Sequence, residues 1–315
     1  MEKKQRAQTE AKTDKPVRLA AIDIGSNAIR MVIADLYRFQ GQVQIETIEK
    51  FRVQIRLGDD VFSKQVISKE KTETAVEAFI EFSQHCAKLK AQKISAIGTS
   101  ALRDAQNSAD FAKAIHKASG IKIETISGLK EAQLVYRAIQ YIVHMQGKNL
   151  LLIDIGGGSV ELSTVSNSKI IKTNSFQSGT IRSLLKPLDP KKTYENYFNK
   201  DTFHYETAIG TGGNFEAILK LILKLQEENK INPRHDPSSD HKFNIFEVTE
   251  LQEIVKKMSI DDRIKKLKLR KDRADVIMPA IDNVVAILNL AQCTEVLVPQ
   301  VGLKDGILLD LFENF

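Results

Sequence analysis

The sequence predicts an α/β protein made of two duplicated domains that face one another across a cleft. Segment 150–165, LLLIDIGGGSVELSTV, fits a strand, a tight turn and a second strand. Segment 19–36, LAAIDIGSNAIRMVIADL, carries the same pattern 131 residues earlier, and IDIG at 22–25 matches IDIG at 153–156. One strand-turn-strand unit therefore opens each half of the chain, and 315 residues are enough for two domains with separate cores.

The rest of the first half alternates between strand and helix patterns. Residues 42–55 alternate polar and apolar side chains, which predicts one or two strands. Ser68 is expected to begin a helix whose inner face carries Ala75, Phe79 and Phe82. The later elements are predicted as a strand at 93–99, a turn at 100–104, a helix at 107–119, a strand at 121–126 and a helix at 129–144. This alternation is characteristic of an α/β domain.

The second half repeats the alternation after its opening hairpin. Strands are predicted at 170–176, 207–213 and 296–298, and helices at 180–186, 215–227, 248–259, 274–291 and 307–315. Residues 186–192 and the polar stretch 229–241 are predicted to be loops. We expect a disordered charged tail at 1–16 and domains at 17–141 and 142–315, with the last helix packing back on the first domain.

Composition and charge restrict the class of protein. Hydrophobic residues make up 42% and charged residues 27%, as in a folded soluble chain, and the net charge of +6 permits a polyanionic partner. Cys86 and Cys293 lack the spacing of a zinc site or disulfide framework, which fits a reducing cytoplasm. The first fifteen residues lack the apolar core of a signal peptide, and no segment has the unbroken apolar length of a membrane span.

Glycine turns after predicted strands form a candidate phosphate site. Gly156, Gly157 and Gly158 put no Cβ in the way, so backbone N–H groups can close on an anion, whereas a purely structural hairpin would more often use Asn-Gly or Asp-Gly. Similar turns lie at 23–27, at 210–213 with Gly212 and Gly213, and at 302–306. Because ligands gather at the carboxyl ends of strands in α/β sheets, we expect the four turns to meet at one cleft.

Several charged residues near these turns are candidates for chemistry. Asp23, Asp154 and Glu161 are the candidate ligands of Mg²⁺, which prefers oxygen donors, although Glu161 has the alternative of a solvent-facing strand residue. Glu131 lies in the first turn of its predicted helix, where interaction with the helix dipole is favoured over the role of a general base by position alone. Arg103 follows a strand and could clamp a phosphate or lie on the surface.

A basic segment and a polar loop leave alternatives open. Arg273 could also face phosphate, and it ends a basic segment that is equally consistent with a solvated face and with a track for a long polyanion. The other members of that segment are Lys256, Lys257, Arg263, Lys265, Lys266, Lys268, Arg270 and Lys271. The loop residues His235, Asp236, Asp240 and His241 resemble a metal set, but their spacing fits no standard site.

Seven motifs together resemble the exopolyphosphatase and guanosine-pentaphosphate phosphohydrolase family. They are AAIDIGSNAIRMVI, IGTSALRDAQN, ISGLKEAQLVY, LLIDIGGGSVEL, AIGTGGN, RADVI and VGLKDGILLDL, which extend from residue 19 to the C-terminus. The resemblance implies the actin-like fold of two duplicated ribonuclease-H-like domains. It also implies Mg²⁺-assisted release of terminal phosphate from polyphosphate or guanosine pentaphosphate, with no nucleic-acid or membrane partner expected and a homodimer left open.

The resemblance also assigns roles to individual residues. Glu131 matches the glutamate proposed as the base for the attacking water, which reverses the interpretation from position alone. Asp154 and Glu161 match the acidic pair associated with the metal, and Arg103 and Arg273 match arginines that face the phosphate chain. The phosphate loops of the family match the turns Gly25-Ser26-Asn27 and Gly156-Gly157-Gly158-Ser159.

Departures from the family pattern keep two other functions open. Lys130 stands where the family usually has a first glutamate, and Pro299 and Lys304 replace the usual serine and arginine of the last glycine turn. Lys cannot make the planar fork of Arg. A non-catalytic sensor of guanosine pentaphosphate or tetraphosphate is therefore the second hypothesis. An ATP-dependent kinase of the actin-like fold is the third.

Overall fold

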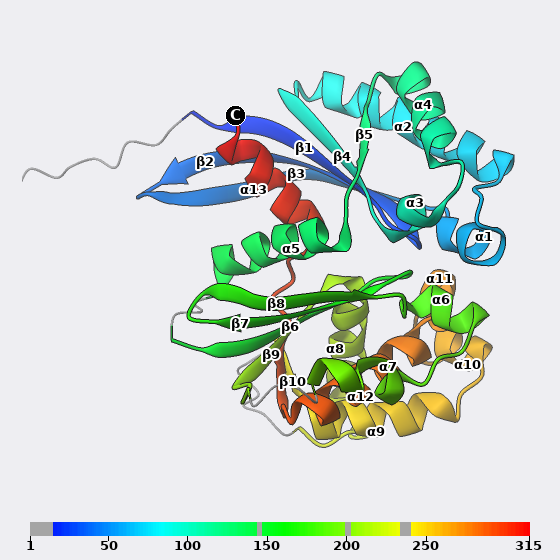
Figure 1. Ribbon diagram of the computed structural model, residues 1–315, viewed down its shortest axis with the longest axis vertical. Coiled ribbons are helices and arrows are strands. Elements are labelled where there is room, and N and C mark those ends of the chain that lie inside the picture. The colour runs from blue at the N-terminus through cyan, green and yellow to red at the C-terminus, as the bar shows by residue number, and fades with distance from the viewer. Residues whose placement is uncertain (1–14, 144–146, 199–202, 234–240) are drawn as a thin grey trace, which may run out of the picture.

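The structure is a computed structural model that describes residues 15–143, 147–198, 203–233 and 241–315. It contains two sheets, each flanked by helices, in two α/β domains that lie one above the other in Figure 1. The predicted α/β class is therefore confirmed. Residues 1–14 of the predicted tail lie outside the described residues.

The first domain is built on a five-stranded sheet in the order β3-β2-β1-β4-β5. Its strands are β1 (Val17–Ile24), β2 (Ala28–Phe39), β3 (Gln42–Gln54), β4 (Lys93–Gly98) and β5 (Ile123–Thr125). Its helices are α1 (Leu57–Lys64), α2 (Lys69–Lys88), α3 (Ser100–Asp104), α4 (Ser108–Ser119) and α5 (Gly128–Ile142). Ser68 caps α2 as predicted, because its side chain accepts a hydrogen bond from the Lys71 backbone. The turn predicted at 100–104 is wrong: this segment is α3, closed by helical hydrogen bonds such as Arg103 N–H to Thr99 O.

The second domain is built on a six-stranded sheet in the order β10-β11-β9-β6-β7-β8. Its strands are β6 (Asn149–Ile155), β7 (Val160–Ser166), β8 (Lys169–Phe176), β9 (Thr207–Thr211), β10 (Lys242–Asn244) and β11 (Glu295–Leu297). Its helices are α6 (Thr180–Leu185), α7 (Pro190–Phe198), α8 (Gly212–Glu227), α9 (Ile245–Lys256), α10 (Ile260–Lys265), α11 (Lys271–Ala274) and α12 (Ile277–Ala291). The loop predicted at 186–192 is wrong at its end, because Pro190 begins α7 and the Asp189 side chain accepts from the first turn.

The duplication predicted from the sequence is present in the topology. The order β3-β2-β1-β4-β5 repeats as β8-β7-β6-β9-β11, and β1–β2 and β6–β7 are both antiparallel hairpins. In the first hairpin Asp23 lies opposite Arg30, and in the second Asp154 lies opposite Glu161. The equivalent residues Asp23 and Asp154 are thus both acidic, whereas Arg30 and Glu161, which are also equivalent, carry opposite charges.

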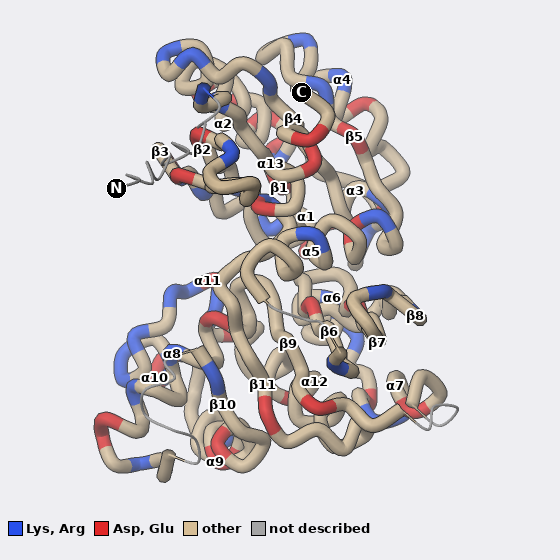
Figure 2. Tube along the Cα trace, turned by 90° about the vertical axis from the view of Figure 1, so that its left-hand side faces the viewer, with Lys and Arg blue, Asp and Glu red and all other residues tan. Residues whose placement is uncertain are grey.

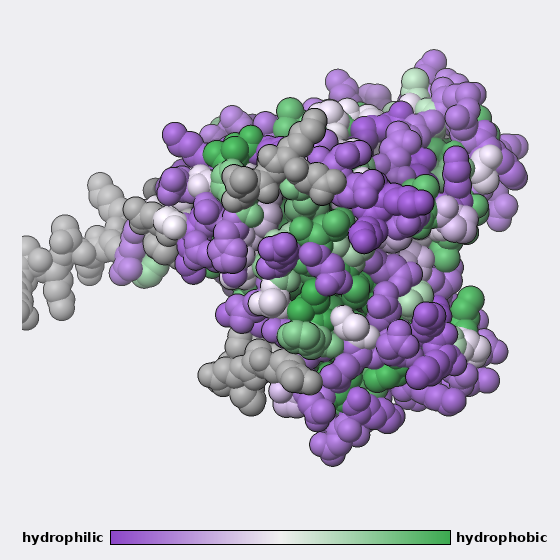
Figure 3. Space-filling model, turned by 60° about the horizontal axis from the view of Figure 1, so that its bottom comes forward, coloured by the Kyte–Doolittle hydropathy of each residue, from purple (hydrophilic) through white to green (hydrophobic). Residues whose placement is uncertain are grey.

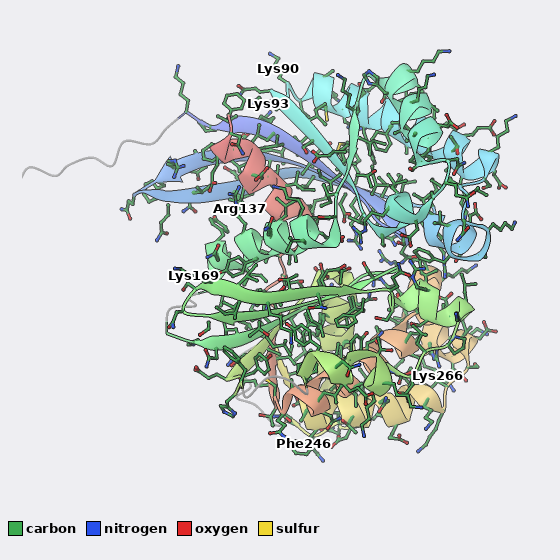
Figure 4. The ribbon with its side chains drawn as sticks, in the orientation of Figure 1. Lys90, Lys93, Arg137, Lys169, Phe246 and Lys266 are labelled. Carbon is green, nitrogen blue, oxygen red and sulfur yellow. The ribbon has the colours of Figure 1, made fainter. Side chains whose placement is uncertain are left out.

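The last helix, α13 (Leu303–Glu313), packs against α5 and β1 of the first domain. Leu303, Ile307 and Leu308 join a hydrophobic cluster with residues of both sheets. Arg137 of α5, labelled in Figure 4, pairs with Asp310 at 2.8 Å and with Glu313 at 3.1 Å. The chain therefore crosses back to the first domain at its end, and α13 begins four residues earlier than the helix predicted at 307–315.

One stretch of the described residues, Lys271–Ala291, is long and apolar enough to cross a membrane by length and composition alone. Its main part, α12, packs against α7, α8 and α9, and its buried side chains belong to the core of the second domain. The face in Figure 3 is mainly hydrophilic, with hydrophobic side chains gathered near its centre. The apolar composition of α12 is thus accounted for by the core.

Candidate active site

A cavity of about 270 Å³ lies between the two domains, at the strand ends where the glycine turns are found. All four predicted turns contribute to it. The predicted phosphate-site residues that line it are Gly25, Ser26, Asn27, Gly156, Gly157, Ser159, Gly212, Gly213 and Arg273. Asp23, Asp154 and Glu131 line it as well. The predicted residues Arg103, Gly158 and Glu161 are not part of the lining.

The glycines allow close approaches that a side chain would prevent. A Cβ on Gly157 would lie 3.0 Å from the Cβ of Ser26, so the two hairpin turns of the duplicated domains touch there. Gly212 has a φ of +80°, and a Cβ on it would lie 2.8 Å from Asp154 Oδ1. A Cβ on Gly158 would overlap Phe62 and Ser100, so Gly158 serves packing behind the cavity wall.

Glu131 is a buried carboxylate in the cavity wall, 8% exposed, at the start of α5. Arg103 of α3 donates a hydrogen bond to Glu131 Oε2 at 2.8 Å and another to the backbone oxygen of Ile126 at 3.0 Å. Burial and the nearby charge of Glu161 raise the pKa of Glu131 well above its ordinary value, and Arg103 opposes that rise. The carboxyl is thus held in one orientation by Arg103, and the charge of Arg103 favours its ionised form.

Glu161 is also buried and lies close enough for its charge to act on Glu131. Its Oε1 accepts a hydrogen bond from Ser175 Oγ at 2.7 Å and lies 4.0 Å from Arg103 Nη2. Burial raises the pKa of Glu161, and the hydroxyls of Ser175 and Ser159 and the charge of Arg103 oppose the rise. Arg103 therefore connects the two buried glutamates, at 2.8 Å from Glu131 and 4.0 Å from Glu161. Arg103, Gly158 and Glu161 lie next to the lining of this cavity, and their assignment to phosphate contact and metal ligation stays a prediction.

Asp23 and Asp154 come from equivalent positions of the two hairpins and line the cavity. Burial raises the pKa of Asp154 to about 7, with the charges of Glu161 and Asp23 adding to the effect. Burial also raises the pKa of Asp23, whose Oδ2 lies 3.5 Å from Arg30 Nη1. Two buried carboxylates that repel one another favour a bound cation.

These two carboxylates fit a site in which Mg²⁺ would be bound by protein carboxylates and substrate phosphates together. Among the described residues, no group of three or more His, Cys, Asp and Glu side chains is placed to hold a metal ion. Mg²⁺ usually takes only one or two carboxylates and completes its shell with waters and substrate phosphates. Asp23 and Asp154 supply that number, and Glu161, with its own hydroxyl partner, is not required.

Four cationic residues that were not predicted as site residues also belong to the cavity wall. Arg30, Arg52, Arg270 and Lys304 all line the cavity. Arg30 could have been found from the repeat, because it stands 131 residues before Glu161. Arg52 lies beside it in the sheet register, on β3, and only the strand pairing indicates its place.

The basic segment at 256–273 divides into residues with different roles. Arg270 and Arg273 line the cavity. The Arg263 side chain is turned inward and donates to the backbone oxygens of Val255 and Ala274, so it is structural. The lysines at 256, 257, 265, 266, 268 and 271 are exposed. Of the suspected metal set, residues 235, 236 and 240 lie outside the described residues.

Fold and site together define a two-domain α/β protein whose cleft joins glycine turns, carboxylates and arginines, as in proteins that act on phosphates. A model of the Ppx/GppA phosphatase family matches residues 36–315, and the chain belongs to this family. The crystal structure of the Aquifex aeolicus member of the family is 23% identical, with 95% of this chain and 99% of that chain covered and a TM-score of 0.75.

Two further proteins are similar to this chain over almost its whole length. An exopolyphosphatase from Cytophaga hutchinsonii is 23% identical, with 94% of this chain and 98% of that chain covered and a TM-score of 0.79. A Haemophilus influenzae protein named as a candidate exopolyphosphatase is 21% identical over 313 residues, 94% of this chain and 92% of its own length. The two solved structures establish that the fold is the actin-like two-domain fold.

Proposed function

We propose that this chain is a phosphohydrolase that releases the terminal phosphate of inorganic polyphosphate or of guanosine pentaphosphate. The observation that carries the proposal is Glu131, a buried carboxylate in the cavity wall held by Arg103 at 2.8 Å. Names of relatives support the polyphosphate substrate, since the Cytophaga hutchinsonii protein is an exopolyphosphatase.

The proposed step is attack by water on the terminal phosphorus. Glu131 accepts a proton from the water, the new P–O bond forms, and the bridging P–O bond to the next phosphate breaks. The products are orthophosphate and a chain one phosphate shorter. Such reactions depend mainly on positioning and on stabilisation of the spread negative charge. Backbone N–H groups of the glycine turns and Arg273, which line the cavity, would provide that stabilisation.

Asp23 and Asp154 would hold Mg²⁺ in the cleft. When bound there, Mg²⁺ would neutralise charge on the phosphate oxygens and orient them.

The test is phosphate release in Mg²⁺, measured for wild type and for Glu131→Gln, with a chelator as the metal-free arm. Gln keeps the size and the acceptor for Arg103 but cannot take the proton. We expect kcat to fall by roughly 10²- to 10⁴-fold, the usual contribution of a general base. Glu124→Gln, the same change at an exposed residue of β5, is the control and should release phosphate like wild type.

Three results would change or refine the proposal. Equal release by Glu131→Gln and wild type would exclude Glu131 as the base. Comparison of kcat/KM for polyphosphate and guanosine pentaphosphate identifies the preferred substrate. Tight binding of guanosine pentaphosphate without release at any pH or in any metal would replace the hydrolase proposal with a sensor.

A further inference from the structure

Asp272 of α11 connects arginines of both domains at the cavity. Its side chain is buried, 1% exposed, and pairs with Arg52 of β3 in the first domain. Its Oδ1 also lies 3.4 Å from Nε of Arg270, which directly precedes α11 in the second domain. Both arginines line the cavity. Figure 2 shows α11 at the edge of the second domain that faces the first, with Lys and Arg residues next to it.

A second set of contacts fixes α11 against the first domain. The Asn27 side chain, from the turn of the β1–β2 hairpin, donates to the Asp272 backbone oxygen at 3.2 Å. Asp275 accepts a hydrogen bond from Arg56 at 2.7 Å. The carboxylate of Asp272 is therefore held in place from both sides, and it fixes the two arginines in turn.

The positive charge around Asp272 exceeds what this carboxylate can neutralise. Burial and the charges of Arg30, Arg270 and Arg52 together lower the pKa of Arg273 to about 10, while Asp272 opposes them. Burial and the charges of Arg270 and Arg30 also lower the pKa of Arg52. Three guanidinium groups, those of Arg30, Arg52 and Arg270, thus lie within electrostatic reach of Arg273.

Two buried polar atoms of the Arg52–Asp272 pair also lack a hydrogen-bond partner. Within the part of the chain that the structure describes, Arg52 Nε and Asp272 Oδ1 are buried and have no hydrogen-bond partner. A free N–H on a buried guanidinium costs energy unless a ligand meets it. Arginine forks match phosphate oxygens with two parallel hydrogen bonds, so a phosphate group has the chemistry of a partner for Arg52, whereas the acceptor Asp272 Oδ1 faces Arg270 Nε at 3.4 Å.

We propose that Arg52 and Arg270, positioned by Asp272, form a second phosphate subsite, which binds a phosphate further along the substrate than the reacting one. This inference rests on the proposed function, because it assigns the reacting phosphate to the glycine turns beside Glu131. Arg52 and Arg270 come from opposite domains. The subsite is therefore complete only while α11 lies against the first domain. The ligand class is a chain of several linked phosphates, and the inference predicts that pyrophosphate uses only the subsite beside Glu131.

The test measures affinity, so that it does not depend on turnover. Glu131→Gln protein is titrated calorimetrically in Mg²⁺ with pyrophosphate and with a long inorganic polyphosphate. Arg270→Gln and Arg52→Gln, each added to that background, should weaken binding of the long chain by tenfold or more. They should leave pyrophosphate binding within twofold. Lys117→Gln on α4 removes the same charge from an exposed site outside the cavity lining and should change neither affinity.

Asp272→Asn tests the positioning role. It should lower the ratio of long-chain to pyrophosphate affinity in the same direction, whereas general loss of structure would weaken both ligands alike. Arg270 is half exposed, so Arg270→Gln keeps the test independent of folding.

Two results would overturn the inference. One is an unchanged affinity ratio in both arginine variants, and the other is equal weakening of pyrophosphate and the long chain, which would place the arginines at the reacting phosphate. Either result leaves the phosphate-release test of Glu131 unaffected. Conversely, an Arg270-dependent affinity ratio in a protein that releases no phosphate would support the subsite and refute the hydrolase proposal.

Discussion

Gly306 lies where α13 crosses α5, and replacement by alanine should strain the contact that joins the end of the chain to the first domain. A Cβ at this position would lie 2.0 Å from the carbonyl oxygen of Leu134 and 2.6 Å from its carbonyl carbon. Ordinary contact begins near 3.4 Å, so the helices would have to separate by about 1.4 Å. Both contacting atoms are backbone, and no rotamer change can relieve the overlap.

The change in stability of Gly306→Ala is the sum of two opposing effects. Alanine in place of a helical glycine stabilises by about 1 kcal/mol, because it reduces the entropy lost on folding. Overpacking costs about 1–3 kcal/mol, and a backbone contact places the cost at the upper end. The difference is a net loss of about 2 kcal/mol, which lowers the thermal midpoint by roughly 3 °C for a protein of this size.

Calorimetric or fluorimetric melting of Gly306→Ala against wild type measures this loss. Gln133→Ala on the exposed face of α5 is the control, and its stability should stay within about 0.5 kcal/mol of wild type. The substitution should also shift residues of the cavity wall, because α5 carries Glu131 and α13 carries Leu303 and Lys304. An unchanged or higher midpoint in Gly306→Ala would refute the close crossing of the two helices.

Two pH-dependent predictions follow from the buried carboxylates. The folded pKa of Asp154 is about 7 against an ordinary 3.8, so its stability contribution is full below the ordinary pKa and is lost as pH rises to about 7. In a chelator, Asp154→Asn should therefore gain stability over wild type between pH 4 and 7, whereas a pH-independent difference in melting would contradict this. Arg103 lowers the pKa of Glu131, so Arg103→Gln should move the acid limb of the phosphate-release profile to higher pH. An unmoved limb would show that Arg103 does not keep Glu131 ionised.

Sequence alone determined the features of this protein that depend on short segments. The two hairpins are encoded by alternating strands and glycine turns, and their repetition 131 residues apart predicted two similar domains and one shared cleft. The positions of Asp23 and Asp154 followed from the same repeat. The position of Glu131 in the first turn of its helix predicts only an interaction with the helix dipole, because the helix sequence does not show that Arg103 and Glu161 lie beside it.

Only the tertiary structure decided how the charges are combined. Arg103 and Glu131 are 28 residues apart, and their pairing depends on how the fold places the C-terminal part of α3 beside the first turn of α5. Arg52 and Asp272 are 220 residues apart and belong to different domains, so their contact exists only because the domains pack face to face. A strand pattern fixes which way a side chain points within its sheet. The neighbour that it meets across a domain interface is set by how the hydrophobic cores dock, and no local pattern carries that information.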